Sequence, residues 1–263
     1  DTQSIQTQTS AIEADTQAIQ TQTSAIETDT QEIQSDTDTI IGTTSVGTSR
    51  DAHIKGIHTL AQLKAVNDGT TGTITLDDYS IALTGSASDL SAAFAGTFAA
   101  AYEGNLTISD SDATSLTAST LSAIGGATTG TVTVTNAVAI SGNHDQVTAA
   151  LITDGTKVSV SDATVTIDDV ATTPIAATEL SAIGGATTGT VTVSNAVAIT
   201  GNHDQVTAAL VTSDSRVVLG GSSNDATVTI NDGDSTAITA TELSNIGGQT
   251  NGTVTVTNAV AIS

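Results

Sequence analysis

One long segment occurs twice in the chain almost unchanged, and this duplication constrains the fold more than any other feature. The segment LSAIGGATTGTVTVTNAVAISGNHDQVTAALIT at 121–153 and its copy at 180–212 differ at three positions. A third copy begins at Leu243 and is cut at Ser263, and a diverged copy covers 63–94. The period of about 58 to 63 residues predicts repeated units that cover one another's apolar faces. Because the last copy is cut in mid-unit, we expect the physiological polypeptide to continue beyond Ser263.

Each period contains a weaker half-repeat, because residues 131–155 align with residues 164–189. Each half has alternating Val and Thr, then a polar turn, then a short Ala/Leu segment closed by glycine. The alternation of β-branched residues predicts a strand, and the closed Ala/Leu segment predicts a short helix. The expected unit is therefore strand-turn-helix-turn, about 26 to 37 residues long.

The N-terminal segment 1–41 is built from a repeated unit that is two heptads long. Isoleucine recurs at every seventh position, and a threonine lies three positions before each isoleucine. This spacing predicts a parallel coiled coil with Thr at a and Ile at d, and Ile at d favours three chains over two. The alternative is a disordered tract rich in Gln and Thr. The side chains expected at the interface are Ile5, Ile12, Ile19, Ile26, Ile33, Ile40, Thr9, Thr16, Thr23 and Thr30.

Residues 50–66 predict a second helix that forms a neck, in which His53 and His58 are structural side chains and not metal ligands. The predicted fold class is α+β and elongated fibrous: an N-terminal parallel trimeric coiled coil, followed by strand-turn-helix units stacked as an α/β solenoid-like shaft. The predicted segments are a coiled-coil stalk (1–41), a linker and neck helix (42–62), diverged repeat 1 (63–120), repeat 2 (121–179), repeat 3 (180–242) and truncated repeat 4 (243–263).

The composition excludes several classes of protein. The chain has 28 acidic and five basic residues and a formal charge of −23, so no nucleic-acid partner is expected. No apolar run approaches about 20 residues, so no membrane insertion is expected. Two Phe, two Tyr and no Trp or Met leave few large side chains, which predicts a thin core. Cysteine is absent, which excludes disulfides.

The repeated sequence Gly-Asn-His-Asp-Gln contains His144 and His203, two of the four histidines. The favoured interpretation is a helix cap that is copied with the repeat, with Asn143 or Asp145 as the capping side chain. The alternative is a metal or anion site at His144 and His203, formed where symmetry brings several copies together. The half-repeat lacks a histidine at the equivalent position, so the fold does not require the imidazole. A catalytic triad needs a nucleophile in an asymmetric pocket, and a thin repetitive layer offers no evident place for one, so no catalytic residue is expected and the chain is predicted not to be an enzyme.

Acidic residues near the third copy suggest a second candidate metal site. LGGSSNDATV (219–228) resembles one degenerate copy of the calcium-binding nonapeptide of RTX proteins, although such sites need tandem copies. Asp225, Asp232 and Asp234 are therefore candidate calcium ligands, and otherwise no cofactor is expected. The competing interpretation is that Asp and Asn here only favour turns by bonding their own backbone. Pro174, the single proline, is expected to fix where the helix that follows it begins.

TTGTVTVTNAVAIS and AATELSAIGG resemble the Thr/Ala-rich repeats of long surface proteins of marine cyanobacteria and of the tail-fibre-like proteins of their phages. The heptads are similar to trimeric coiled-coil shafts of phage fibres. The resemblance covers about residues 63–263 and implies a structural protein of an extracellular, virion-surface fibre, which acts as a spacer for host attachment. The expected partners are two further copies of the chain, in a homotrimer, and other virion or surface-assembly proteins at its ends.

Two other functions remain open. A secreted bacterial adhesin or surface-layer filament at the cell surface would share the repeats and would depend on calcium. A polysaccharide depolymerase would need paired carboxylates and aromatic platforms, which the composition disfavours.

Overall fold

A computed structural model describes residues 1–41, 50–220 and 224–263. These residues form eight α-helices and seventeen short strands. The helices are α1 (Thr2–Ile41), α2 (Leu60–Gly69), α3 (Ala87–Ala93), α4 (Ala118–Gly125), α5 (His144–Leu151), α6 (Ala177–Gly185), α7 (His203–Val206) and α8 (Ala240–Gly247). Helix α7 continues into a π-helical turn, η1 (Thr207–Val211), and a 3-10 turn, η2 (Ser213–Ser215).

The strands form five small sheets, and all pairings among the described residues are parallel. Two sheets have three strands, which lie in the order β1 (Ala52–Ile54), β2 (Thr73–Leu76), β4 (Thr97–Phe98) and in the order β3 (Leu83–Gly85), β5 (Leu106–Ile108), β7 (Val132–Val134). The five-stranded sheet has the order β13 (Val217–Leu219), β11 (Val191–Val193), β9 (Thr164–Ile167), β8 (Ala139–Gly142), β6 (Ser115–Thr117). The four-stranded sheet has the order β10 (Pro174–Ala176), β12 (Ala198–Gly201), β14 (Thr227–Ile230), β16 (Val254–Val256), and β15 (Ala237–Ile238) pairs with β17 (Ala261–Ile262) in the fifth.

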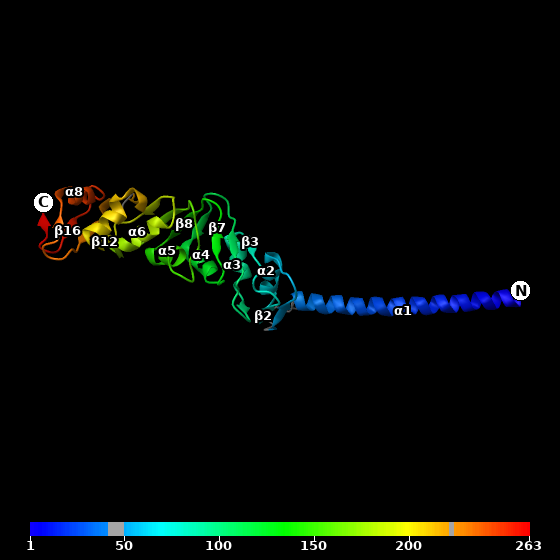
Figure 1. Cartoon of the computed structure of the whole chain (residues 1–263). Helices are drawn as coiled ribbons and strands as arrows, with labels where there is room; N and C mark the ends of the chain where they lie inside the picture. The colour runs from blue at the N-terminus through cyan, green and yellow to red at the C-terminus, as the bar shows by residue number, and fades with distance from the viewer. Residues whose placement is uncertain (42–49, 221–223) are drawn as a thin grey trace.

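Paired strands come from consecutive circuits of the chain, which we call layers. Ala52 pairs with Ile74 near one end of the molecule, and Ala198 pairs with Thr227 near the other. Each of these layers carries one helix, and each helix from α2 to α7 contacts the helix of the next layer. Figure 1 shows the helices following one another in chain order between α1 and the C-terminus. The helices therefore form one row in which spatial neighbours are also neighbours in sequence.

Short and long layers alternate. Helix α4 begins at Ala118, α5 at His144, α6 at Ala177 and α7 at His203, so the step from α5 to α6 is longer than the steps on either side of it. The short layers carry two strands, such as β7 and β8, and the layer that ends at α8 carries the three strands β13, β14 and β15. One period of the sequence repeat, from α4 to α6, therefore comprises two layers, one short and one long.

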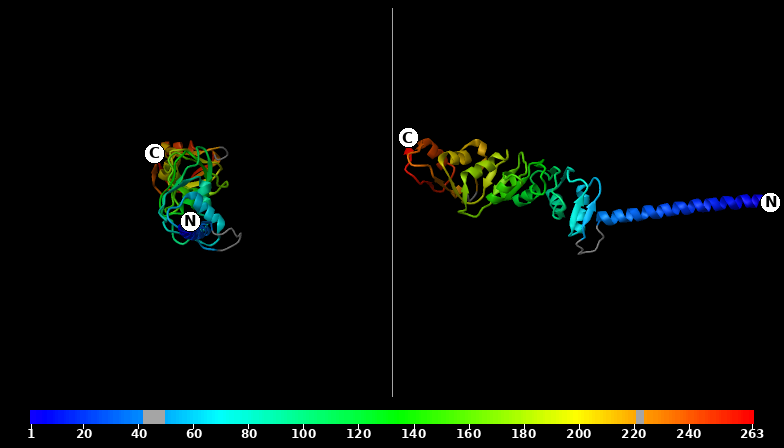
Figure 2. Two further views of the ribbon diagram at one scale, coloured as in Figure 1. Left: turned by 90° about the vertical axis from the view of Figure 1, so that its right-hand side faces the viewer. Right: turned by 60° about the horizontal axis from the view of Figure 1, so that its bottom comes forward.

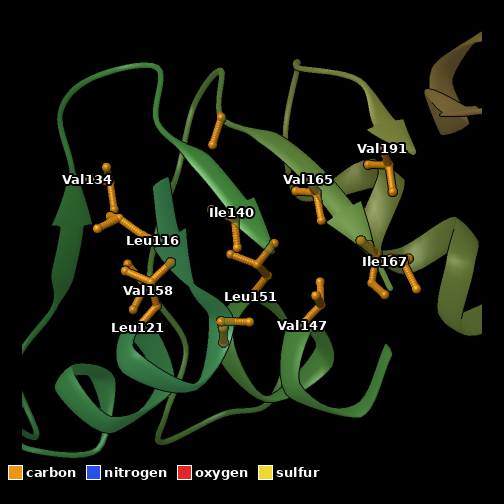
Figure 3. Packing of buried hydrophobic residues seen from close by; sticks show 14 of the residues in the cluster. Leu116, Leu121, Val134, Ile140, Val147, Leu151, Val158, Val165, Ile167 and Val191 are labelled. Atoms are coloured by element: carbon orange, nitrogen blue, oxygen red, sulfur yellow. The ribbon is translucent and has the colours of Figure 1, made fainter. Parts of the chain in front are cut away.

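The core lies between the strands and the helix layer. In β9 the side chains of Val165 and Ile167 are buried, and the threonines between them are exposed, because side chains alternate across a strand. Val147 and Leu151 of α5 point toward these strands from the opposite side (Figure 3). Small β-branched side chains suffice because only one helix and a few strands enclose each layer.

Buried threonines join four of the layers to the layer before each of them. The hydroxyl of Thr187 donates to the carbonyl oxygen of Ala163 (2.6 Å) and accepts from the N–H of Gly189 (3.0 Å). A Cβ on Gly189 would collide with the Ala163 carbonyl, so the Thr-x-Gly sequence needs glycine at its third position. The same arrangement recurs at Thr70 with Gly72, Thr128 with Gly130 and Thr250 with Gly252.

We expect Gly189→Ala to lower the free energy of unfolding by about 1–3 kcal/mol, because the methyl group forces apart two adjacent backbones. Gly185→Ala is the matched control, since no atom lies within 4 Å of the position that its Cβ would take, and it should change stability by less than about 0.5 kcal/mol. Urea denaturation of both variants checks the prediction. Equal effects of the two substitutions would contradict it.

The N-terminal segment is a helix, but the coiled coil predicted for it is not found. Ile12 and Ile19 are 66% and 62% exposed, so no other helix among the described residues covers them. The Thr16 and Thr23 hydroxyls donate to backbone oxygens of their own helix, at 2.7 and 2.9 Å, and Thr9 is exposed. Figures 1 and 2 show α1 projecting from the body with the N-terminus at its far end. The side chains of Ile5, Ile26, Ile33, Ile40 and Thr30 lie outside the described residues.

The predicted fold class was wrong. The described residues form an α/β arrangement of eight helices and five small parallel sheets, in place of an α+β fibre on a coiled-coil stalk. Parallel strands need crossover connections, which mixes helices with strands along the chain. A second finding also argues against the predicted solenoid-like shaft. The strands do not line up into one sheet along the molecule, because β9 joins β8 on one side and β11 on the other, and no sheet among the described residues exceeds five strands.

The predicted neck helix begins later than expected. Ala52 and Ile54 are buried and alternate with His53, so residues 52–54 form β1 and pair with β2. Helix α2 starts only after Thr59, which caps it. The His53 Nε2 atom lies 2.6 Å from Asp77 Oδ1.

His58 is a buried structural histidine. The Tyr102 hydroxyl donates to the Ile81 carbonyl (2.6 Å) and accepts from His58 Nε2 (3.1 Å). Burial lowers the pKa of His58 and so favours its neutral ring in the folded chain, which agrees with a structural role.

Pro174 differs from expectation, because it is the first residue of β10, a position that tolerates the missing N–H.

Candidate functional site

The repeated Asn-His-Asp-Gln sequence forms the start of α5 and of α7. The Asn143 side chain accepts from the Gln146 N–H (2.8 Å), and the Gln146 side chain accepts from the Asn143 N–H (3.1 Å). This capping box bonds two of the N–H groups that a helix start leaves without partners. Asn143 is therefore the cap, and Asp145 lies exposed in the first turn of the helix. His144 is the first helical residue, a position that directs its own N–H out of the helix.

A buried carboxylate from the next layer binds His144 through two hydrogen bonds. Asp169 Oδ2 accepts from the backbone N–H of His144 (2.6 Å), and Asp169 Oδ1 accepts from the imidazole Nδ1–H (2.7 Å). The Asp169 side chain is 6% exposed and the His144 side chain is 12% exposed. The second copy repeats this geometry, with both distances from His203 to Asp232 at 2.7 Å. A carboxylate at a helix N-terminus is favoured because the helix dipole is positive there.

Each aspartate is also bound by an asparagine from the layer beyond. Asn195 Nδ2 donates to the backbone oxygen of Asp169 (2.7 Å), and Asn258 Nδ2 donates to the backbone oxygen of Asp232. Three consecutive layers are therefore connected through one aspartate. We call these residues the His–Asp–Asn ladder: His144, Asp169 and Asn195 in one copy, and His203, Asp232 and Asn258 in the other.

A third copy of the ladder lacks the imidazole. The N–H of Ala87, at the start of α3, donates to Asp110 Oδ2 (2.6 Å), and Asn136 Nδ2 donates to the Asp110 backbone oxygen (2.6 Å). The aspartate and asparagine therefore join layers without a histidine. The imidazoles of His144 and His203 add a bond between layers and a titratable group.

The imidazole of His203 lies between two carboxylates. Its Nε2 is 3.3 Å from Asp204 Oδ1, opposite the Nδ1 contact with Asp232. The hydrogen bond to Asp232 raises the pKa of His203, and the charges of Asp232, Asp204 and Glu242 act in the same direction against desolvation. The surroundings of His203 therefore favour its protonated imidazole, which suits a structural ion pair better than a general base.

The pKa of His203 predicts how the stability depends on pH. A raised folded pKa means that its contribution is fully present below about pH 6.5, the value of an unperturbed histidine, and is lost as pH rises through the folded pKa. We expect the difference in unfolding free energy between the native chain and His203→Gln to be larger at pH 5.5 than at pH 8. Urea denaturation of both chains at both pH values measures it. A difference that grows with pH would contradict the prediction.

The candidate metal ligands are not brought together. Asp232 is engaged by His203, and Asp234 Oδ1 accepts from the N–H of Ala259 (3.1 Å). Asp225 lies exposed, and Gly221 and Ser223 of the RTX-like segment lie outside the described residues. His144 and His203 each contact their own aspartate, in separate layers. Across residues 1–41, 50–220 and 224–263 no group of three or more His, Cys, Asp or Glu side chains could hold a metal ion.

Two hollows lie away from the ladder. One, of about 530 Å³, is lined by Tyr102, Lys157 and the glycine-rich segment 125–132. The other, of about 450 Å³, is lined by residues of α2, and its Lys64 forms an ion pair with Asp89 (2.8 Å). Neither hollow contains a histidine, so the imidazoles have no adjacent space for a substrate in these two places.

Sequence reasoning missed three members of the ladder: Asp169, Asn195 and Asn258. A signal for the aspartates was present, because Asp169 follows TVTID and Asp232 follows TVTIN at the same spacing. The asparagines lie in the repeated segments VSNAV and VTNAV. Pairing these positions across layers required the strand register, which the sequence alone left open.

None of the described helices is both long enough and apolar enough to cross a membrane. A scan against protein-family models finds no match, and searches of curated proteins and of solved structures find none either.

Proposed function

We propose that the chain is a structural spacer segment of an extracellular surface assembly, with a virion fibre that serves host attachment as the leading candidate. The observation that carries the proposal is the connection of successive layers by the His–Asp–Asn ladder and by the buried Thr-x-Gly bonds. These bonds fix each layer to its neighbours, and the two termini lie at opposite ends of the molecule (Figure 2). A spacer needs both properties, and it needs no catalytic centre.

A distance measurement tests the spacer function. The chain lacks cysteine, so Ile57→Cys and Asn251→Cys, both at exposed positions, introduce two unique sites for spin labels. With the labelled chain diluted in unlabelled chain, so that distances between copies do not contribute, we expect one narrow distance distribution by double electron–electron resonance, unchanged between low and high salt. A broad distribution would count against a spacer, and turnover of a polysaccharide by the same protein would replace the proposal with an enzyme.

Association with further copies of the chain is part of the proposal. The support is the pair of exposed isoleucines on α1, Ile12 and Ile19, since apolar side chains in a row on a polar helix favour association. A homotrimer has three times the chain mass of 26.0 kDa, and sedimentation equilibrium of the full chain distinguishes it from a monomer. The double substitution Ile12→Gln with Ile19→Gln should lower the mass of the assembly in solution. Ile57→Gln, the control, should leave that mass unchanged.

The alternative is a bacterial surface adhesin that depends on calcium. It would need Asp225 and Asp234 to bind the ion together with residues from another chain, because Asp232 is already engaged by His203. Sedimentation with and without EDTA separates the two functions. Loss of assembly in EDTA would favour the adhesin, and an unchanged mass would favour the metal-independent spacer.

A further inference from the structure

One buried histidine joins the first layer, formed by β1 and α2, to the two layers that follow it. His58 lies between β1 and α2 and is 2% exposed. Its Nε2 donates to the Tyr102 hydroxyl (3.1 Å), which lies between β4 and β5, and that hydroxyl donates to the Ile81 carbonyl (2.6 Å), between β2 and β3. One imidazole therefore connects three consecutive layers. We call His58, Ile81 and Tyr102 the His–Tyr joint.

The hydrogen bonds of the joint determine where the imidazole carries its proton. A tyrosine hydroxyl has one proton, and Tyr102 gives it to the Ile81 carbonyl, so Nε2 of His58 must supply the other. The second ring nitrogen, Nδ1, is buried and has no hydrogen-bond partner among the described residues. Protonation would place a charged N–H there without an acceptor, which costs more than a buried lone pair. The joint therefore accommodates the neutral ring and not the imidazolium.

Two titratable side chains among the described residues act on the ring, Tyr102 and Asp78. Burial raises the pKa of Tyr102, so its hydroxyl keeps its proton. The negative charge of Asp78 favours a protonated His58, but the Asp78 carboxylate already accepts from the N–H (2.8 Å) and the hydroxyl (2.6 Å) of Ser80. Burial outweighs this charge and lowers the pKa of His58.

The lowered pKa gives the pH range in which the joint weakens. Its contribution to stability is fully present above about pH 6.5, the value of an unperturbed histidine, and is lost as pH falls through the lower pKa of the folded chain. Hydrogen bonds lower the pKa values of Asp77, Asp78 and Asp89, the nearby carboxylates, so these groups keep their charge as His58 is protonated. Mild acid therefore acts here on the imidazole first.

The other three histidines have a different environment. His53, His144 and His203 each have a ring nitrogen within 2.7 Å of an aspartate oxygen, which accepts a proton from the ring in its charged form. His58 has no such partner, and it lies in the layer at the end of the row. Its strand β1 pairs with β2 alone among the described strands. In a stack where each layer contacts its neighbours, a terminal layer can open while the rest stays folded.

We propose that the His–Tyr joint is an acid-sensitive switch, in which uptake of a proton at Nδ1 of His58 releases the first layer from the layers that begin at β2. Helix α1 contacts β1 and α2 and projects from this end of the body (Figure 1). Acid therefore frees the direction of α1 relative to the remaining layers, which stay folded. The inference concerns one layer and stands whether or not the spacer function holds.

Hydrogen exchange of the full chain at pH 7 and pH 5 tests the switch. The readout is the protection factor of amides in residues 52–54 and 63–69, which removes the intrinsic pH dependence of exchange. We expect protection to fall about 5- to 20-fold between the two pH values, because uptake of one proton on opening shifts that equilibrium by at most about 10-fold per pH unit. Amides of β9 and β11 should not share this loss.

Two variants assign the effect to one ring. His58→Gln keeps a donor for the Tyr102 hydroxyl and removes the titratable nitrogen, so protection of the first layer should become independent of pH. His53→Gln removes the other histidine of this layer, and the loss of protection in acid should persist. Equal protection of the native chain at both pH values overturns the proposal. A loss that survives in His58→Gln, or that β9 and β11 share equally, also overturns it.

Nitrogen NMR of the native chain gives a second test that does not depend on the folding of a variant. We expect the His58 ring to be neutral at pH 7, with its proton on Nε2, and its protonation to coincide with the loss of amide protection in the first layer. A ring that becomes protonated while these amides keep their protection would overturn the switch.

Discussion

Replacing Asp169 with alanine is expected to lower the free energy of unfolding by about 2–4 kcal/mol. The carboxylate is 6% exposed and accepts from both the backbone N–H and the imidazole of His144. Its removal leaves the helix N-terminus and the ring nitrogen without partners in a place that water reaches poorly, and an unsatisfied buried donor costs more than the bond it lost. Urea denaturation, followed by circular dichroism, measures the change.

Asp168→Ala is the matched control for this prediction. Asp168 is the neighbouring residue, carries the same charge and is exposed. Its replacement should change stability by less than about 0.5 kcal/mol, as is usual for surface positions. If Asp168→Ala and Asp169→Ala destabilise the chain equally, the effect comes from net charge, and the ladder does not join the layers in the way proposed.

Replacing Ile199 with alanine is expected to lower the free energy of unfolding by about 2–5 kcal/mol. Ile199 is fully buried beneath β14, and truncation there leaves a cavity between two layers that both contribute backbone to the same sheet. The layers are held by hydrogen bonds in register, so they cannot collapse into the space. Urea denaturation of the purified variant measures the decrease in the free energy of unfolding.

Ile262→Ala provides a comparison at the equivalent position of the last layer. Ile262 is 62% exposed, so its truncation removes little buried surface and should lower the free energy of unfolding by less than about 1 kcal/mol. The two isoleucines share the sequence Asn-Ala-Val-Ala-Ile and differ in what covers them. Equal losses at the two positions would contradict the prediction, because they would show that Ile262 is buried in solution.

The local elements could be predicted where the sequence carries a short-range signal. The helix expected in DQVTAAL is α5, and Asn143 caps it because its side chain bonds the nearby Gln146. The assembly of these elements could not be predicted. The number of strands differs from layer to layer, and a Val/Thr strand fits several neighbours equally well, so the sequence does not show which strand pairs with which.

The candidate site, too, could be predicted from the sequence only in part. The repeated His-Asp pair drew attention to His144 and His203, but the informative aspartate for each histidine lies a full layer away along the chain. The heptads at the N-terminus led to a wrong prediction, that of a coiled coil, for a different reason. Their spacing is a property of the sequence, whereas a coiled coil needs partner helices, and the single helix α1 leaves Ile12 and Ile19 exposed.

The pairing of each strand with the strand one layer away, as in Ala52 with Ile74, has a consequence for how the chain folds. Every sheet contact closes a loop of one layer, so the entropy lost on closure does not grow when layers are added. Parallel sheets ordinarily fold slowly because their contacts are distant in sequence, but here the contact order is low. Folding can therefore nucleate in any layer and spread to both sides, and the rate of refolding should be set by one layer and not by the length of the chain.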